Sequence, residues 1–232
     1  MNSLDKKIPK LKDLDDYYET YFIDAPLVEI TEDLGFIISL EYKKMGFKNT
    51  LDKMFIREEV LDKLLEAKRY LPEGITFKIW DSYRPLALQE ELYNYYKDKL
   101  IKEYNLENSS IEKQNKLISK FVSIPSCDKE YPPLHTTGGA VDLTLVFTDT
   151  LEELDMGTKF DDFTDKAKTD YYEGTDNIEI INNRRILYNA MINAGFTNLP
   201  SEWWHYDYGN RAWAYYKNDE ARYMGIFNLD KE

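Results

Sequence analysis

Two segments of the chain, residues 57–71 and 182–195, carry apolar residues at the three- and four-residue spacing of an amphipathic helix. This spacing gathers apolar side chains on one face, which a helix can bury against a core. The inward positions are Val60, Leu61, Leu64, Leu65 and Lys68 in the first segment and Ile186, Leu187, Ala190, Met191 and Ala194 in the second. Gly195 suits the position just beyond the second helix, where the backbone often turns left-handed.

A short strand and a long helix are predicted on either side of the sequence DSYRP. Apolar and polar residues alternate over residues 75–80, as in a half-buried strand. Pro85 is well placed as the first residue of a helix that continues over residues 86–104, since proline lacks only an N–H that the first helical turn leaves unbonded. Residues 34–42 alternate more loosely and are also expected to be β-like.

The clearest strand is residues 140–147, AVDLTLVF. Successive side chains of a strand point to opposite faces, so its apolar positions fall into two sets. One face carries Val141, Leu143, Leu145 and Phe147, and the other carries Asp142, Thr144 and Val146. Asp142 therefore opens the strand on the face opposite the main hydrophobic set.

The remaining segments are polar and lack a clear period. Residues 1–24 are charged and tyrosine-rich and are expected to form an arm lying on the domain, and residues 105–134 are expected to be irregular. Residues 149–179 hold eleven acids against three lysines, which predicts a solvated loop insertion, although such a loop could cover a site. No repeat or linker divides residues 1–232, so we predict one α+β domain with helices around a sheet.

Composition and charge narrow the possible partners. A hydrophobic content of 43% and an aromatic content of 15% are ample for a packed core. The net charge of −13 repels phosphate backbones and anionic lipids, so neither nucleic acid nor a membrane surface is an expected partner. No apolar run approaches the roughly 20 residues that cross a bilayer. We therefore expect a cytoplasmic protein that binds a small molecule, and the sequence leaves its oligomeric state open.

Cysteine occurs only once in the chain. Cys127 is the single cysteine, which excludes an internal disulfide and agrees with a reducing compartment. We interpret Cys127 as a free structural thiol, with a nucleophile as the alternative.

The chain has two histidines, His135 and His205. His135 precedes Asp142 by seven residues, and positions at an odd separation point to opposite faces of a straight strand. The two side chains converge only if the chain turns between them, and Gly138 and Gly139 provide that freedom. A lone histidine–aspartate pair at this spacing is a weak signal.

The second histidine lies in SEWWHYDYGN and strengthens the pattern. Two imidazoles and one carboxylate, from His135, His205 and Asp142, together with water make the open four-coordinate site of catalytic zinc. Glu202 is then the candidate general base for that water. Glu202 and His205 diverge in a straight strand, so we predict a turn at Glu202–Trp203 that leads into a strand at His205.

Two further groups complete the candidate site, and each has an ordinary alternative. Arg84, at the mouth of the helix after DSYRP, is a candidate to stabilise negative charge on a carbonyl oxygen, although it could simply pair with Asp81 or Glu90. Trp203 and Trp204 are candidates for an apolar shell around the metal. Both histidines could instead be buried, hydrogen-bonded residues of the core.

Other kinds of chemistry find less support. No GxSxG sequence indicates a serine hydrolase, and neither GxxxxGK[ST] nor GxGxxG indicates nucleotide binding. The acidic run DDFTDKAKTD lacks the ligand spacing and the glycine of an EF-hand loop.

These residues resemble the signatures of the VanX-like D-alanyl-D-alanine dipeptidases, which are zinc D,D-peptidases. HTTGGAVDLTL is similar to the family pattern SxHxxGxAxD, and SEWWHY to ExxH. The similarity extends to DSYRP, to residues 156–163 and to the helix before SEWWHY, in the order of the family, over roughly residues 35–208.

The resemblance implies that His135, Asp142 and His205 bind one Zn²⁺, that Glu202 is the catalytic base and that Arg84 steadies the transition state. It also implies a central antiparallel sheet flanked by helices, the D,D-peptidase/Hedgehog-like fold. The implied activity is hydrolysis of D-Ala-D-Ala in peptidoglycan precursor metabolism, in either vancomycin resistance or D-alanine recycling.

One position departs from the pattern, because Pro133 stands where the signature has serine. Proline offers neither a hydroxyl nor a backbone N–H to a substrate. The preference for a dipeptide is therefore open, and a D,D-carboxypeptidase acting on longer muropeptides is the alternative enzyme. A non-catalytic zinc-binding module is the alternative outside enzymology, although it would not need Glu202 as a base.

Overall fold

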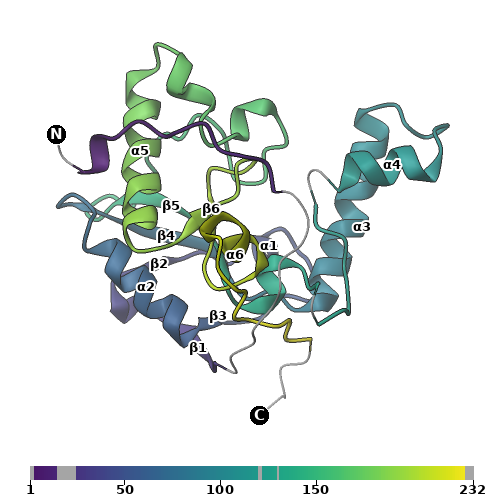
Figure 1. The fold of residues 1–232 in the computed structure, drawn as a ribbon, viewed down its shortest axis with the longest axis horizontal. Coiled ribbons are helices and arrows are strands. Elements are labelled where there is room, and N and C mark those ends of the chain that lie inside the picture. Colours follow the sequence, from purple (N-terminus) through teal and green to yellow (C-terminus); the bar gives the residue numbers. More distant parts are fainter. Residues whose placement is uncertain (1–2, 15–24, 120–121, 130, 228–232) are drawn as a thin grey trace.

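The computed structural model describes residues 3–14, 25–119, 122–129 and 131–227 (Figure 1). Over these residues, a five-stranded sheet with the strand order β2-β4-β5-β7-β6 lies at the centre. The strands are β2 (Ile37–Ile38), β4 (Ile75–Asp81), β5 (Ala140–Phe147), β7 (His205–Asp207) and β6 (Thr197–Asn198). β2 runs parallel to β4 and the other neighbours are antiparallel, so the predicted antiparallel sheet is confirmed apart from one edge strand.

Helices and a small second sheet surround this centre. The helices are α1 (Glu41–Lys44), α2 (Glu58–Lys68), α3 (Leu86–Glu103), α4 (Ile111–Ile118), α5 (Ile178–Asn193) and α6 (Arg211–Lys217). Strands β1 (Leu27–Ile30) and β3 (Met54–Arg57) pair antiparallel in the second sheet. None of the helices in the described ranges is long and apolar enough to pass through a membrane.

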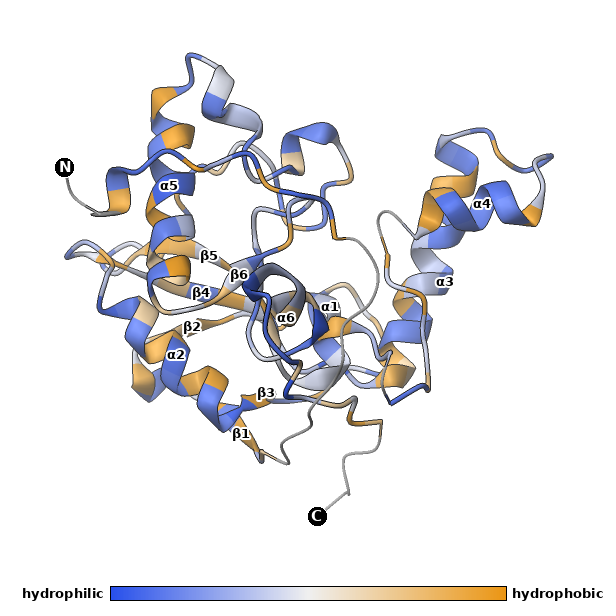
Figure 2. Cartoon of the chain, in the orientation of Figure 1, coloured by the Kyte–Doolittle hydropathy of each residue, from blue (hydrophilic) through white to orange (hydrophobic). Residues whose placement is uncertain are grey.

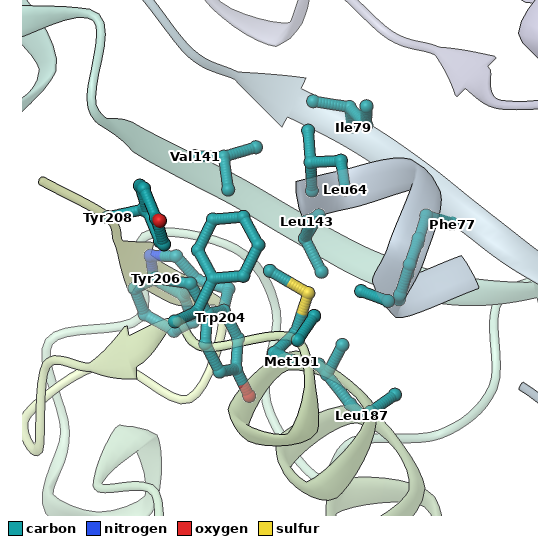
Figure 3. Packing of buried hydrophobic residues seen from close by; sticks show 14 of the residues in the cluster. Leu64, Phe77, Ile79, Val141, Leu143, Leu187, Met191, Trp204, Tyr206 and Tyr208 are labelled. Atoms are coloured by element: carbon teal, nitrogen blue, oxygen red, sulfur yellow. The ribbon is translucent and has the colours of Figure 1, made fainter. Parts of the chain in front are cut away.

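The main hydrophobic core lies between one face of the central sheet and helices α2 and α5. Phe77 and Leu145 are cross-strand neighbours on this face, as are Ile79 and Leu143. Figure 3 shows Leu64 of α2 close to Ile79 and Leu143 of the strands, with Met191 and Leu187 of α5 next to them. Because this face is filled by the core, the side chains that alternate with it, Asp142 among them, point to the opposite face.

A second, smaller hydrophobic cluster holds α3 and α4 together. Its buried members are Tyr42, Leu88, Leu92, Tyr96, Leu100, Ile118 and Val122. Figure 1 shows α3 and α4 on the side of the molecule away from α2 and α5, and Figure 2 shows apolar residues along both helices. These helices therefore share one hydrophobic cluster, and we call this part of the molecule the α3–α4 lobe (residues 86–119 and 122–123).

Helix α4 lies inside residues 105–134, which the sequence analysis expected to be irregular. Ser110 caps this helix, because its hydroxyl accepts a hydrogen bond from the backbone N–H of Lys113. Ile118 is buried at its other end, whereas Ile111 is 72% exposed. The segment has an amphipathic helical pattern that the sequence analysis overlooked among its many polar residues, so the prediction was wrong for residues 111–118.

Smaller differences occur at other boundaries. Only two residues of 34–42 pair as a strand, and the chain enters α1 at Glu41. Helix α5 begins at Ile178, inside the predicted acidic insertion, and Gly195 follows it with φ 99° as expected. The prediction of strand 140–147 agrees with β5 at both ends.

The predicted arm is described only in part, and its residues 15–24 lie outside the described ranges. Leu4 and Ile8 are buried in the main core. The side-chain amide of Asn189 in α5 donates hydrogen bonds to the carbonyl oxygens of Leu4 and Lys6. Residues 4–6 therefore contact α5, whereas the carbonyl oxygen of Lys12 accepts a hydrogen bond from the hydroxyl of Tyr216 in α6.

Candidate metal centre and active site

The centre of the candidate site lies on the sheet face opposite the main core. Asp142 in β5 pairs directly with His205 in β7, and Asp81 at the end of β4 pairs with Asp142 from the other side. The ladder between β4 and β5 shifts between Ile79 and Asp81, which is a bulge that redirects the chain at this point. Three neighbouring strands therefore present polar side chains in a row.

His135 reaches the same place from a turn before β5. Residues Leu134–Thr137 form a 3-10 helix, and Gly138 ends it in the left-handed region with φ 71°. A side chain at Gly138 would be strained in this conformation, so glycine is required here. The turn that the sequence analysis expected between His135 and Asp142 is present.

The three ligand atoms converge closely. His135 Nε2 lies 3.1 Å from His205 Nδ1 and 3.3 Å from Asp142 Oδ2, and His205 Nδ1 lies 3.0 Å from Asp142 Oδ1. All three residues are buried. Two imidazole nitrogens and one carboxylate oxygen are the donor set of an open zinc site.

Hydrogen bonds on the far side of each imidazole determine which nitrogen carries the proton. His135 Nδ1 lies 2.8 Å from the carbonyl oxygen of Ser82, which can only accept. His205 Nε2 lies 3.1 Å from Asp207 Oδ1, which accepts as a carboxylate. In the neutral rings, the nitrogens that face each other therefore both carry lone pairs.

Two facing lone pairs repel unless a positive charge lies between them. The negative charge of the Asp142 carboxylate also favours a cation at this position. Burial alone would lower the pKa of His205, but Asp207 and Asp142 raise this pKa well above its ordinary value. Burial alone would raise the pKa of Asp142, but His135 and His205 hold it below its ordinary value. The residues fit a divalent metal ion, whose bound state needs this combination of neutral rings and an ionised carboxylate.

Glu202 lies beside the ligand cluster, at the end of a turn. Its backbone N–H donates to the carbonyl of Leu199, and the side-chain amide of Asn198 donates to the carbonyls of both Glu202 and His205. Glu202 Oε2 lies 3.9 Å from His205 Nδ1. The predicted turn into β7 is therefore present, and it brings the carboxylate of Glu202 to the same side as His205.

The electrostatic surroundings of Glu202 suit proton transfer. Burial, together with the negative charges of Asp142 and Asp161, raises the pKa of Glu202 to about 8. A bound cation favours the ionised form and so lowers this pKa towards neutrality. A carboxyl with a pKa near neutral pH can both accept and return a proton.

Arg84 pairs with Asp81 and also lies next to the ligand cluster, so its two expected environments coexist. Its Nε donates to Asp81 Oδ2 at 2.8 Å, so the ordinary ion pair exists. One terminal nitrogen also lies 3.8 Å from Asp142 Oδ2, and the guanidinium lies over the ring of Tyr42. Arg84 is therefore a buried cation next to the ligand cluster.

A cavity of about 60 Å³ adjoins these groups. Its lining includes Arg84, His135, Asp142, Glu202 and His205, which are the five residues singled out from the sequence. Trp203 and Trp204 are buried behind the turn, at 2% and 1% exposure.

The structure adds Asp161, which sequence reasoning did not assign. Its carboxylate accepts hydrogen bonds from the hydroxyls of Tyr42 and Tyr96 and lines the cavity. Burial and the charge of Asp142 raise the pKa of Asp161 to about 6. The predicted acidic insertion thus contributes to the cavity, and Phe163 from the same segment lines it too. The sequence MGTKFDDF matched the family pattern, but no spacing linked Asp161 to the histidines.

Asp207 is a second residue that the sequence analysis passed over. It lies two residues after His205, so the alternation of a strand places both on one face. That spacing in HYD was a usable signal. Asn210, which caps α6, also donates to Asp207 Oδ1 at 2.6 Å, so one carboxylate oxygen contacts both His205 and Asn210.

Comparisons with known proteins match more than half of the chain to one family. The model of peptidase family M15, described as D-ala-D-ala dipeptidase, matches residues 42–223. A D-alanyl-D-alanine dipeptidase of Synechocystis is 27% identical over 70% of this chain and 72% of its own length. Those of Enterococcus faecalis and Enterococcus faecium are 33% and 32% identical, over 57% and 64% of this chain and 62% and 70% of their own lengths.

Solved structures give a weaker overall similarity. A mutant of the vancomycin-resistance D,D-pentapeptidase VanY with Zn(II) aligns at a TM-score of 0.40 and 16% identity, over 75% of this chain and 85% of its own. VanYB with D-Alanine-D-Alanine aligns at 0.42 and 17%, over 75% and 84%. The identification rests on the family match and on the sequence relatives. This chain belongs to the D-Ala-D-Ala dipeptidase family, a family of metallopeptidases.

Proposed function

We propose that the chain hydrolyses the dipeptide D-Ala-D-Ala in a zinc-dependent reaction. The observation that carries the proposal is the convergence of His135, Asp142 and His205 on one point, with Glu202 beside them and Arg84 behind. The named activity of the sequence relatives supports the choice of substrate.

His135 Nε2, His205 Nδ1 and a carboxylate oxygen of Asp142 would hold one Zn²⁺ per chain. Zinc held there supplies Lewis acidity, which makes water more acidic and polarises a carbonyl. The far-side acceptors, the carbonyl of Ser82 and the carboxylate of Asp207, keep both rings oriented for binding.

Glu202 takes a proton from the attacking water and delivers it to the amine that leaves. Its position 3.9 Å from His205 Nδ1 brings it within reach of a water molecule at the ligand cluster. Arg84 stabilises the negative charge that develops on the carbonyl oxygen, because its permanent charge is buried and already oriented by Asp81.

Asp161 is suited to bind the free ammonium group of the dipeptide. Its carboxylate faces a cavity that also contains Asp142 and Glu202, so a cationic group is favoured there. The hydroxyls of Tyr42 and Tyr96 hold the carboxylate in place. This contact would favour a dipeptide, whose charged end lies one residue from the scissile bond.

The alternative enzyme is a D,D-carboxypeptidase, and Pro133 is the reason to keep it. Purified protein loaded with zinc should be offered D-Ala-D-Ala and a muropeptide pentapeptide ending in D-Ala-D-Ala, with zinc quantified in the same sample. The proposal predicts higher kcat/KM on the dipeptide. Faster release of D-alanine from the pentapeptide would contradict it.

We further propose a cytoplasmic role in peptidoglycan precursor metabolism. Removal of D-Ala-D-Ala deprives precursor synthesis of its usual terminus, whether in vancomycin resistance or in D-alanine recycling. The acidic surface and the small cavity suit a small, soluble substrate.

A further inference from the structure

Gln89 lies in the first turn of α3 and is only 1% exposed. Its side-chain oxygen accepts a hydrogen bond from Arg84 at 2.7 Å. Its side-chain nitrogen donates to the carbonyl oxygen of Ser123, also at 2.7 Å. One buried amide therefore connects the active-site arginine with the chain that follows α4.

The chemistry of the two partners allows only this orientation of the amide. A guanidinium can only donate, so it must face the oxygen of Gln89. A backbone carbonyl can only accept, so it must face the nitrogen. Neither contact survives if the amide is reversed, and both are lost if the side chain is apolar.

The chain tied by Gln89 forms one wall of the cavity. Val122 and Ser123 line it together with Leu92 and Tyr96 of α3. Val122 belongs to the hydrophobic cluster of the α3–α4 lobe, which is separate from the main core. Phe160 packs against both clusters, and Gln89 adds a polar link between the lobe and Arg84 beside the metal ligands.

The cavity that this wall closes is small. About 60 Å³ corresponds to roughly four to six water molecules by this measure of volume. A dipeptide with methyl side chains replaces several of these waters, and the third residue of a longer peptide must fit beside the wall at Val122 and Ser123. The position of this wall therefore bears on how long a peptide the cavity accepts.

We propose that Gln89 is a positioning residue that couples Arg84 to the wall at Val122 and Ser123, and that this tether restricts the enzyme to dipeptides. The inference rests on the proposed function and deepens it, because it assigns the length limit to the α3–α4 lobe. Gln89 acts through its two partners and does not itself touch reacting atoms.

Two substitutions separate the two halves of the link. In Gln89→Glu, a carboxylate still accepts from Arg84 but repels the carbonyl of Ser123, so the wall is released while the arginine stays anchored. In Gln89→Leu both contacts are lost. Gln114→Glu is a matched control, because Gln114 in α4 donates to the carbonyl of Leu106 and does not line the cavity.

The test compares kcat/KM for D-Ala-D-Ala and for the D-alanine tripeptide in zinc-loaded wild type and each variant. The ratio of tripeptide to dipeptide should rise at least tenfold in Gln89→Glu and stay within twofold of wild type in Gln114→Glu. Gln89→Leu should raise the ratio and also lower kcat on the dipeptide, since Arg84 loses a partner. Val122→Ala, which thins the wall without touching the link, should raise the ratio as well.

An unchanged ratio in both Gln89→Glu and Val122→Ala overturns the proposal, as does an equal rise in Gln114→Glu. Amide hydrogen exchange supplies a readout that does not need activity: residues 122–123 should exchange faster in Gln89→Glu than in wild type or Gln114→Glu. If wild type cleaves neither peptide while this exchange difference appears, the proposed function fails and the tether stands. If wild type cleaves the dipeptide and exchange is unchanged, the tether fails alone.

Discussion

Glu202 is the side chain whose loss separates catalysis from metal binding most cleanly. It lies beside the ligand cluster but is not one of the three converging ligands. The substitution Glu202→Gln keeps the size of the side chain and removes its ability to accept a proton. We expect kcat to fall by about 10²–10⁴-fold, the usual contribution of a general base, while bound zinc stays at the wild-type level.

The measurement is steady-state hydrolysis of D-Ala-D-Ala with zinc quantified in the same preparations. Loss of zinc together with activity in Glu202→Gln would show that the residue binds metal instead. Activity within threefold of wild type in Glu202→Gln would show that Glu202 is not the catalytic base.

The ionised form of Asp161 destabilises the folded protein at neutral pH. We attribute this cost to the proposed role of Asp161 in binding the ammonium group of the substrate. Burial and Asp142 raise its pKa in the folded protein from 3.8 to about 6. The folded state therefore holds this proton more tightly than the unfolded state. The protonated form of Asp161 therefore stabilises the folded state, fully so below about pH 4, and this contribution is lost as the pH rises through 6.

The variant Asp161→Asn should remove this cost, since an amide does not ionise. In metal-free protein at pH 8, we expect its free energy of unfolding to exceed that of wild type by about 1–3 kcal/mol, and the difference should vanish near pH 4. Urea unfolding at both pH values measures this. KM for D-Ala-D-Ala should rise in the zinc-loaded variant. A variant less stable than wild type at pH 8 would contradict this account of Asp161.

At the scale of elements, the turn that carries His135 is held by Arg57 at the end of β3. The buried guanidinium donates to the carbonyl oxygens of Ala25, Thr137 and Met224, and the backbone N–H of Arg57 donates to the carbonyl of Gly138. Strand β3, the turn before β5 and the chain after α6 therefore meet at one side chain. We infer that this junction keeps His135 in place.

Replacing Arg57 with methionine should keep the packing of its stem and leave three carbonyls without their donor. We expect the free energy of unfolding to fall by about 2–4 kcal/mol, because unsatisfied buried carbonyls are costly. Zinc affinity, measured by competition with a chelator, should weaken several-fold. Arg185→Met is the control: Arg185 on α5 pairs with Glu173 and should leave zinc affinity unchanged. Equal zinc affinity in both variants would show that the junction does not position His135.

Elements with strong local patterns were predictable, and those that depend on distant partners were not. Strand 140–147 alternates along its whole length and agrees with β5. Helix α4 packs on α3 and has one end exposed at Ile111, and its short amphipathic pattern was overlooked because the surrounding segment is polar. Strand β2 is only two residues long, and its parallel pairing with β4 is a contact that its own loose alternation does not indicate.

The same distinction applies to the site. His135, Asp142, Glu202 and His205 lie in two short segments, and the expected turns bring the residues together within each segment. That the two segments meet at one metal was a hypothesis from the residue types, which the family resemblance then implied. Asp161 and Gln89 approach from other parts of the fold, and their contacts depend on the packing of the α3–α4 lobe and of the acidic segment. No spacing within the sequence joins them to the histidines.

At the scale of the whole molecule, the site forms where several parts of the fold meet. The central sheet provides Asp142 and His205, the turn before β5 provides His135, and the α3–α4 lobe closes the cavity. The family match over residues 42–223 includes all of these parts. The proposed activity therefore needs all of these parts, and a metal ion held there would join segments that are far apart along the chain.

The most direct test of the central claim is stepwise return of zinc to metal-free protein, with D-alanine release from D-Ala-D-Ala measured at each step. Chelated protein should be inactive, and activity should rise with added zinc to a plateau near one zinc per chain. His205→Ala, which removes one of the three ligands, should stay inactive over the same range. Hydrolysis by fully chelated protein, or no hydrolysis after one equivalent of zinc has bound, would contradict the account.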